Sequence, residues 1–118
     1  MFKSKYFTSE EFECKCCGKE EMDQAFIGRL NEARRFAGTS FVVNSGFRCP
    51  KHNKEVKGKE DSAHLYGLAA DIETKTDSKR YRVVTALLDA GFTRIGIGNG
   101  FVHVDEDRKK NFNRMWVY

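Results

Sequence analysis

Two histidines and an aspartate constrain this chain more than any other feature of its sequence. His64 and Asp71 belong to the stretch 62–71, and their spacing suits a loop residue that runs into a strand, with both side chains facing one point. His103 stands between two valines, so a strand would project it from the same face as Asp105. Two imidazoles and a carboxylate can hold a tetrahedral zinc ion with its fourth position open to water, as in catalytic rather than structural sites. We therefore expect His64, Asp71 and His103 to bind one Zn²⁺.

The length and composition are those of an ordinary globular domain. The chain has 118 residues, with 40% hydrophobic and 32% charged residues, which predicts a single domain over 1–118. No apolar run approaches the roughly 18 residues that a membrane helix needs. The first residues lack the apolar segment of a signal peptide, so we expect synthesis in the cytoplasm. The positive charges behind the net charge of +4 are dispersed along the chain, which argues against a nucleic-acid partner. We also expect a monomer.

The apolar periodicity predicts an α+β fold in which helices flank a small, mainly antiparallel sheet. Helices are predicted at 8–12, 22–37, 50–56 and 79–90, and strands at 41–43, 68–72, 92–97, 101–105 and 115–118. In the helix at 79–90, the predicted core stripe consists of Tyr81, Val84, Leu87 and Leu88. The glycines around Asn99 suit the tight turn of a hairpin.

The four cysteines form a pattern of their own. Cys14, Cys16 and Cys17 cluster near the N-terminus, and Cys49 follows Arg48. They are either free thiols of a reducing cytosol or a structural cross-link, and that cross-link is a disulfide or a second, structural metal. Adjacent cysteines rarely pair with each other, because a vicinal disulfide is strained. In a cross-link we expect Cys49 to lie within reach of at least one of the other three.

Several motifs in order along residues 40–105 resemble one enzyme family. They are Ser-Gly-Phe-Arg at 45–48, Pro-Lys-His-Asn at 50–53, Ser-x-His-x-x-Gly-x-Ala-Ala-Asp-Ile at 62–72, and Phe-Val-His-Val-Asp at 101–105. In these blocks the chain resembles the zinc D-alanyl-D-alanine carboxypeptidases and murein endopeptidases. The resemblance implies a hedgehog/D-Ala-D-Ala-peptidase-like fold and zinc ligation by His64, Asp71 and His103.

Three further residues of these blocks are candidates for substrate binding. Arg48 offers a planar fork for a carboxylate, and the alternative is a surface salt bridge. The resemblance implies that Ser62 hydrogen-bonds the bound peptide, although it can equally cap a turn. His52 either reaches the cleft or orders the loop that carries Arg48.

These motifs do not identify the residue that acts as the general base. Relatives in the family carry a carboxylate three residues before the last histidine ligand, and here that position is Gly100. Asp105 is the candidate replacement, because strand alternation places it on the face of His103. Asp105 can instead hold an imidazole ligand in its tautomer. Both roles stay open.

The resemblance implies a zinc peptidase that cuts peptidoglycan stem or cross-link bonds involving D-amino acids. A phage lysis product would fit, and a separate route would have to deliver the chain to the cell wall or periplasm. The alternative is a non-catalytic zinc domain that binds wall peptides or a protein partner.

Overall fold

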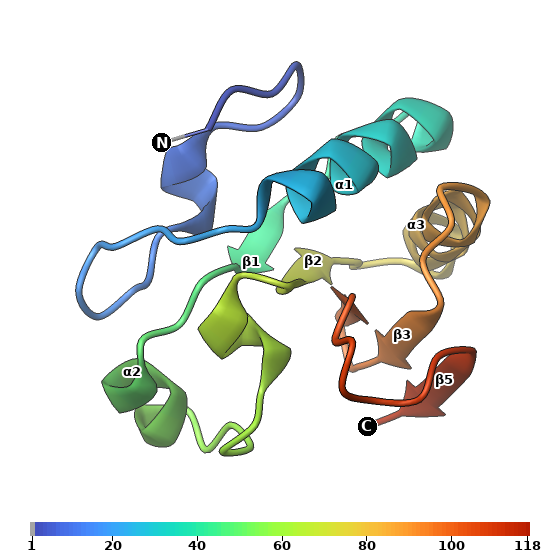
Figure 1. The fold of residues 1–118 in the computed structure, drawn as a ribbon. Coiled ribbons are helices and arrows are strands. Elements are labelled where there is room, and N and C mark those ends of the chain that lie inside the picture. Colours follow the sequence, from blue (N-terminus) through green and yellow to red (C-terminus); the bar gives the residue numbers. More distant parts are fainter. Residues whose placement is uncertain (1) are drawn as a thin grey trace.

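The computed structural model describes residues 2–118 as a five-stranded sheet with helices around it (Figure 1). The elements are η1 (Ser9–Phe12), α1 (Gln24–Ala37), β1 (Val43–Ser45), α2 (Pro50–Glu55), η2 (Ala63–Tyr66), β2 (Ala69–Glu73), α3 (Asp77–Asp89), β3 (Arg94–Ile97), β4 (Phe101–Asp105) and β5 (Arg114–Val117). The strand order is β1-β2-β4-β3-β5, and only β3 and β5 run parallel. The predicted α+β fold with a mainly antiparallel sheet is confirmed.

The two long helices begin and end where local chemistry favours it. The Asp23 side chain accepts a hydrogen bond of 2.9 Å from the Phe26 N–H at the start of α1. Gly38 ends α1 in the left-handed conformation, with φ of 63°. The Thr76 hydroxyl caps α3 by accepting from the Lys79 N–H. The helices predicted at 22–37 and 79–90 are confirmed to within two residues at each end.

The buried face of α3 differs from the predicted stripe. Val83, Ala86 and Leu87 are buried, whereas Tyr81 is 71% and Leu88 47% exposed. The buried residues recur at three and four positions and form a narrow strip, because α3 packs mainly on α1 and less on β4. Tyr81 and Leu88 lie on the exposed side of the helix.

The first strand is also displaced from its prediction at 41–43. It runs over Val43–Ser45, and its pairing with β2 is irregular between those two residues. Phe41 is buried in the core instead of lying in the ladder. The Val42 carbonyl still accepts from the Glu73 N–H at 2.8 Å, so the chain is extended before the assigned strand begins.

The sheet presents its two faces to different surroundings. Ala70 and Ile72 of β2 and Val102 and Val104 of β4 are fully buried in the hydrophobic core. The core is covered by α1 and α3, which lie on the same side of the sheet (Figure 1). Because side chains alternate along a strand, the residues between these point to the opposite face, where the segment 56–68 approaches.

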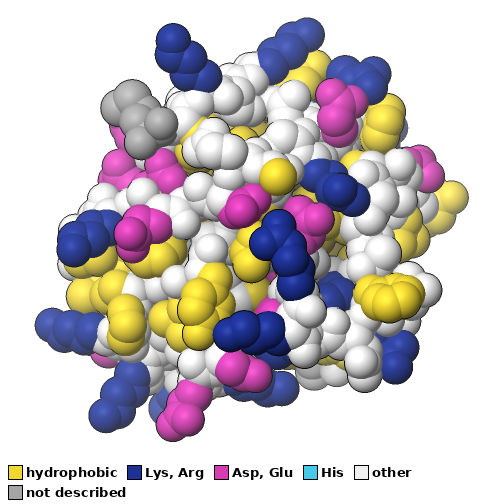
Figure 2. Space-filling view, in the orientation of Figure 1, with side chains coloured by type: hydrophobic (Ala, Val, Ile, Leu, Met, Phe, Trp, Pro, Cys, Tyr) yellow, Lys and Arg dark blue, Asp and Glu magenta, His cyan; other side chains and the backbone are white. Residues whose placement is uncertain are grey.

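The exterior carries mixed charge. Figure 2 shows Lys and Arg side chains interspersed with Asp and Glu over the visible face, and no histidine is visible there. Within residues 2–118, no helix has the length and apolar character to cross a membrane.

Candidate metal centre

A cross-strand pair forms the floor of the candidate site. Asp71 of β2 lies directly opposite His103 of β4 in the antiparallel ladder. Both side chains point away from the core, and His103 Nδ1 lies 2.9 Å from Asp71 Oδ1. The strand register thus brings together two of the three predicted ligands, although they are distant in the sequence.

His64 reaches the same point from the short η2 turn. The Ser62 hydroxyl accepts from the His64 N–H at 3.2 Å, and Gly67 ends the turn with φ of 69°. The buried His64 ring bonds the Gly46 carbonyl through Nδ1 at 2.7 Å. A carbonyl only accepts, so Nδ1 carries a proton, and in the neutral ring Nε2 holds the lone pair. Nε2 lies 3.4 Å from Asp71 Oδ1.

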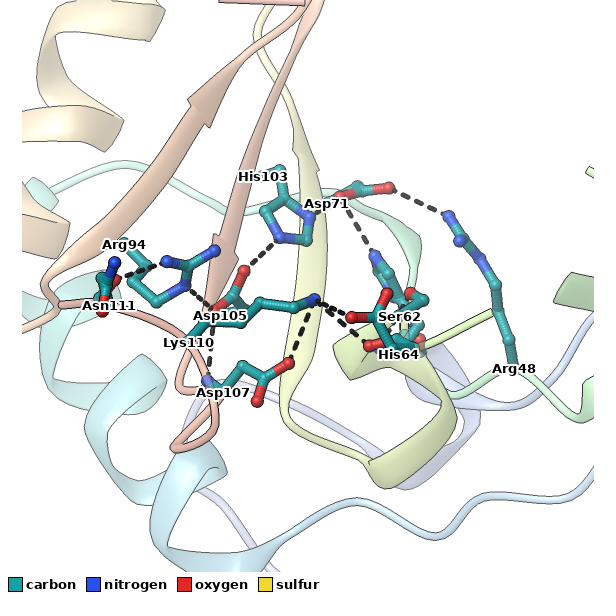
Figure 3. A network of polar contacts seen from close by, with 12 residues as sticks. Arg48, Ser62, His64, Asp71, Arg94, His103, Asp105, Asp107, Lys110 and Asn111 are labelled. Atoms are coloured by element: carbon teal, nitrogen blue, oxygen red, sulfur yellow. Dashed lines mark hydrogen bonds and ion pairs between the residues drawn. The ribbon is translucent and has the colours of Figure 1, made fainter. Parts of the chain in front are cut away.

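These three side chains fit a metal ion. One ligand atom of each lies within 4.8 Å of the others. His64 Nε2 is buried and has no hydrogen-bond partner, which is costly unless something binds its lone pair. The donor set of two imidazoles and a carboxylate suits zinc and leaves a position open. Figure 3 shows the three side chains directed at one another.

The site keeps its carboxylate ionised. Burial raises the pKa of Asp71, but its contacts, the hydrogen bond with His103 first among them, outweigh burial and hold it well below the ordinary value. For His103, burial lowers the pKa, whereas Asp105 and Asp71 raise it by more. In the metal-free chain, the two carboxylates beside His103 favour its protonated form.

Asp105 lies on the far side of the His103 ring from Asp71. Its Oδ2 accepts from His103 Nε2 at 2.7 Å, and its Oδ1 accepts from Arg94 Nε at 2.7 Å and from the Asp107 N–H at 3.1 Å. Burial raises the pKa of Asp105, but these contacts lower it overall. Both oxygens are thus engaged, and the contact with Nε2 directs His103 Nδ1 toward Asp71.

Arg48 approaches Asp71 from the opposite side (Figure 3). Its Nη2 lies 3.5 Å from Asp71 Oδ2, and it also donates to Ser45 Oγ and Asn53 Oδ1 at 3.3 Å each. The side chain is 15% exposed, so this is not the surface salt bridge of the alternative interpretation. Arg48 lines the cleft described below and also orients Asp71.

The other two substrate-binding candidates are placed differently from each other. Ser62 lines the cleft and also caps the η2 turn, so its position is compatible with both of its predicted roles. His52 lies on α2, is not among the described residues that line the cleft, and its Nδ1 is 4.0 Å from Glu55 Oε1. Its contact with substrate stays a prediction that the geometry does not favour.

A cleft of about 460 Å³ opens above the three ligands. This volume lies within the roughly 300–1,000 Å³ of ligand sites. Sequence reasoning missed several residues that line it: Arg94, Phe101, Lys110, Trp116 and Tyr118. The Trp116 and Tyr118 rings lie 5.7 and 6.4 Å from the His103 ring. Alternation along β5 places these two on one face, a signal that the sequence carries.

Gly100 belongs to the turn between β3 and β4. It has φ of 79°, a conformation that glycine adopts without strain. The predicted hairpin is confirmed, since β3 and β4 pair antiparallel on either side of this turn. No side chain can extend from this position toward the ligands.

The cysteines form a second group away from the cleft. The sulfurs of Cys14, Cys17 and Cys49 lie within 4.8 Å of one another, and all four cysteines are free thiols. Cys49 is therefore within reach of the N-terminal cluster, as the sequence predicted.

An α+β domain in which two histidines and an aspartate form a candidate metal site on the floor of an open cleft has the features of a metal-dependent hydrolase. The family model described as Peptidase M15 matches residues 5–105. The chain belongs to the peptidase M15 family, a family of zinc-dependent metallopeptidases, and the resemblance seen in the sequence is confirmed. A search of curated proteins found no match. The matched range includes every site residue predicted from the sequence and ends before β5.

Proposed function

We propose that this chain is a zinc peptidase that hydrolyses peptidoglycan stem or cross-link peptide bonds involving D-amino acids. The observation that carries the proposal is the convergence of His64, Asp71 and His103 beneath a cleft that Arg48 lines. Membership of the peptidase M15 family supports the same chemistry. The site of action would be the cell wall.

The charge of the cleft favours an anionic substrate. The cations that line it are Arg48, Lys57, Lys59, Arg94 and Lys110, and the carboxylates are Asp71 and Asp105. Both carboxylates are already bound to cations or imidazole. Stem peptides carry free carboxylates at their ends and side chains, so a cationic cleft would attract and orient them.

Each residue of the site has a task in this reaction. Zinc, when bound, polarises the scissile carbonyl and lowers the pKa of water. His64, Asp71 and His103 would hold the ion. Arg48 would bind a substrate carboxylate, because its guanidinium lines the cleft while its other donors fix its position. Asp105 would set the tautomer of His103 through the contact with Nε2, which makes it a positioning residue.

The contacts of Asp105 favour the positioning role over the catalytic role predicted from the sequence. A general base must reach the proton that it removes, within about 2.6–3.2 Å or through one water. Both carboxylate oxygens of Asp105 are engaged with His103, Arg94 and a backbone N–H. Asp105 is also only 3% exposed. We propose the positioning role and test it below.

The cleft also bears on the choice between endopeptidase and carboxypeptidase. The segment 56–62 lines one side of it with Val56, Lys57, Gly58, Lys59 and Ser62, none of them aromatic, so it offers little to close that end. We propose an endopeptidase, which needs room for peptide on both sides of the scissile bond.

The decisive experiment is turnover of a purified muropeptide digest by the zinc-loaded chain, with products identified by mass spectrometry. We expect cleavage within stems or cross-links, loss of cleavage in His64→Ala, and a fall of about 10–100-fold in kcat/KM for Arg48→Ala, the value of one charge-assisted contact. Lys75→Ala, on the surface away from the cleft, is the matched control. Release of free D-alanine alone would identify a carboxypeptidase.

One observation favours the second candidate function, a non-catalytic zinc domain that binds wall peptides or a protein partner. Among the described residues that line the cleft, the only two carboxylates are both engaged, and Gly100 offers none. Zinc-loaded protein that binds muropeptides in calorimetry but cleaves none would support this candidate and contradict the peptidase.

A further inference from the structure

The cysteine cluster begins in a tight loop after η1. Cys14 and Cys17 have the C-x-x-C spacing common among structural metal sites, and Gly18 follows with φ of 73°. The Gly18 N–H donates to the Cys14 carbonyl at 2.9 Å, and the Cys14 N–H donates to the Lys19 carbonyl at 2.7 Å. These bonds fold the loop back so that Cys14 and Cys17 present their sulfurs to one point.

Cys49 reaches that point from a distant segment. Its N–H donates to Cys14 Sγ at 3.4 Å, and its own sulfur accepts from the His52 N–H at 3.4 Å. In Figure 1 the loop after η1 lies beside the segment that leads into α2. The sulfurs of Cys14, Cys17 and Cys49 lie within 4.8 Å of one another. In a tetrahedral site with zinc–sulfur bonds of about 2.3 Å, the sulfurs lie about 3.8 Å apart.

The surroundings of Cys14 suit a metal ligand. The residue is buried, with 2% exposed, and the Cys49 N–H donates to its sulfur at 3.4 Å. Metals bind the thiolate form of cysteine, and a buried thiolate is costly without a positive partner. A metal ion would supply that partner.

A metal ion would engage more of these sulfurs than a disulfide would. A disulfide requires two sulfurs about 2 Å apart and would leave the third thiol unused beside it. One metal ion engages all three sulfurs. The fourth cysteine, Cys16, lies between Cys14 and Cys17 in the same loop, exposed and outside the group of three, and is the remaining thiol available for the fourth position.

We propose that Cys14, Cys17 and Cys49 hold a structural zinc ion, separate from the ion at the histidines, with Cys16 available as the fourth ligand. This goes beyond the proposed peptidase function, because the site lies outside the cleft and needs no substrate.

The structural ion would fix the loop that carries Arg48. On one side of Arg48, the Phe47 N–H donates to the Phe12 carbonyl at 2.9 Å. On its other side, Cys49 would be tied through the metal to the loop after η1. The N-terminal segment would thus hold Arg48 against Asp71 by two anchors, one of them a metal.

Metal stoichiometry tests the proposal. Each protein is purified anaerobically with a thiol-free reductant, loaded with zinc, freed of excess metal and analysed for zinc per chain. We expect two ions in the wild type, one in Cys49→Ser, one in His64→Ala and none in the double variant. Lys15→Ser, in the same exposed loop, is the matched control and should keep two.

Cobalt substitution supplies a readout that does not depend on activity or on the stability of Cys49→Ser. In His64→Ala only the cysteine site would load, so the cobalt form should show intense sulfur-to-cobalt charge-transfer absorption. Absence of this absorption would overturn the proposal. A separate wild-type sample, purified anaerobically without reductant and then denatured, should titrate four thiols; fewer than four would also overturn the proposal, in favour of a disulfide. If only the proposed histidine site is wrong, the wild type would hold one ion. Cys49→Ser would lose this ion and His64→Ala would keep it.

Discussion

The two nitrogens of His103 have different partners, and this difference organises the site at the residue scale. Nε2 bonds Asp105 and Nδ1 faces Asp71, so the ring is held between two carboxylates of neighbouring strands. His64 is held in the same manner by the Gly46 carbonyl. Each imidazole thus has one nitrogen fixed by the protein and the other directed at the candidate metal position.

Asp105→Asn should weaken zinc binding instead of abolishing chemistry. The amide keeps the size of the side chain but loses the charge that favours a proton on Nε2, so zinc affinity should fall by about 10–100-fold. Activity on muropeptides should then recover when zinc is added. If Asp105 is the proton carrier, turnover should fall by about 10²–10⁴-fold at full zinc occupancy. The measurements are zinc affinity by competition with a chelator and turnover at saturating zinc.

A neighbouring carboxylate provides the control for this variant. Asp107 is also buried, but it accepts from the Lys109 N–H and contacts Lys110 without touching His103. Asp107→Asn should therefore keep the wild-type zinc affinity. Equal losses in the two variants would show that the effect is a general loosening of the loop and would contradict the positioning role.

The raised pKa of His103 predicts a pH dependence of stability. Its pKa in the folded, metal-free chain lies above the unfolded value of about 6.5, so the stability from its contacts is fully present below pH 6.5 and is lost as pH rises through the raised pKa. Zinc requires the neutral imidazole and binds better over the same rise. The difference in Tm between zinc-loaded and chelated protein should therefore widen above about pH 6.5.

Thermal unfolding at a series of pH values, with zinc or with a chelator, measures this difference. His52→Gln removes a histidine that lies outside the cleft and should leave the pH dependence as it is. A difference in Tm that narrows as pH rises would show that His103 does not lose a proton when the ion binds.

At the scale of the elements, the sequence predicted most of what depends on local pattern. The alternation in Val-His-Val-Asp placed His103 and Asp105 on one face of a strand, as β4 has them. The direct pairing of His103 with Asp71 could not be predicted, because register depends on long-range pairing of β2 and β4. The prediction of the buried face of α3 was wrong for a related reason, since apolar character alone does not say which neighbour a helix packs on.

The same limit applies to the rest of the cleft. The tail was predicted as a strand at 115–118, and β5 confirms this, but its place next to β3 and its parallel direction were not predicted. Only that placement brings Trp116 and Tyr118 over His103. Gly96 lies between these rings and β4, where a Cβ would come within 2.6 Å of Trp116 Nε1.

Gly67→Ala should disturb the element that carries His64. Gly67 has φ of 69°, and a Cβ there would lie 2.0 Å from the Glu21 carbonyl oxygen, a backbone atom that cannot easily move. The strain of the conformation costs on the order of 1–3 kcal/mol, and the collision adds to it. We expect a lower free energy of unfolding and weaker zinc binding, measured by denaturant titration and chelator competition.

Gly38→Ala separates the two contributions. Gly38 has a similar φ of 63°, but nothing lies within 4 Å of its Cβ position, so this variant carries the conformational cost alone. It should lose less stability than Gly67→Ala and should keep its zinc affinity, because Gly38 ends α1 away from the site. Equal losses in the two variants would contradict the close packing of the η2 turn on residues 21–22.

At the scale of the whole molecule, the N-terminal segment forms part of the core that supports the site. Phe2, Phe7 and Phe12 are buried, and the ring of Phe12 lies 5.6 and 5.5 Å from the other two. Phe12 also packs against Gly46, where a Cβ would come within 2.8 Å of its atoms. The Gly46 carbonyl in turn fixes His64, so the packing of this segment extends to a candidate metal ligand.

Phe12→Ala should therefore affect both stability and the metal site. Phe12 is fully buried, and loss of such a ring typically costs about 3–5 kcal/mol. Phe36→Ala is the matched control, because Phe36 is 47% exposed on α1 and should lose far less. Denaturant unfolding of the chelated proteins measures the free energy, and chelator competition on the folded proteins measures zinc affinity. If the N-terminal segment were an appendage, Phe12→Ala would be as mild as Phe36→Ala. A large loss of stability together with weaker zinc binding would show that the segment supports His64 through Gly46.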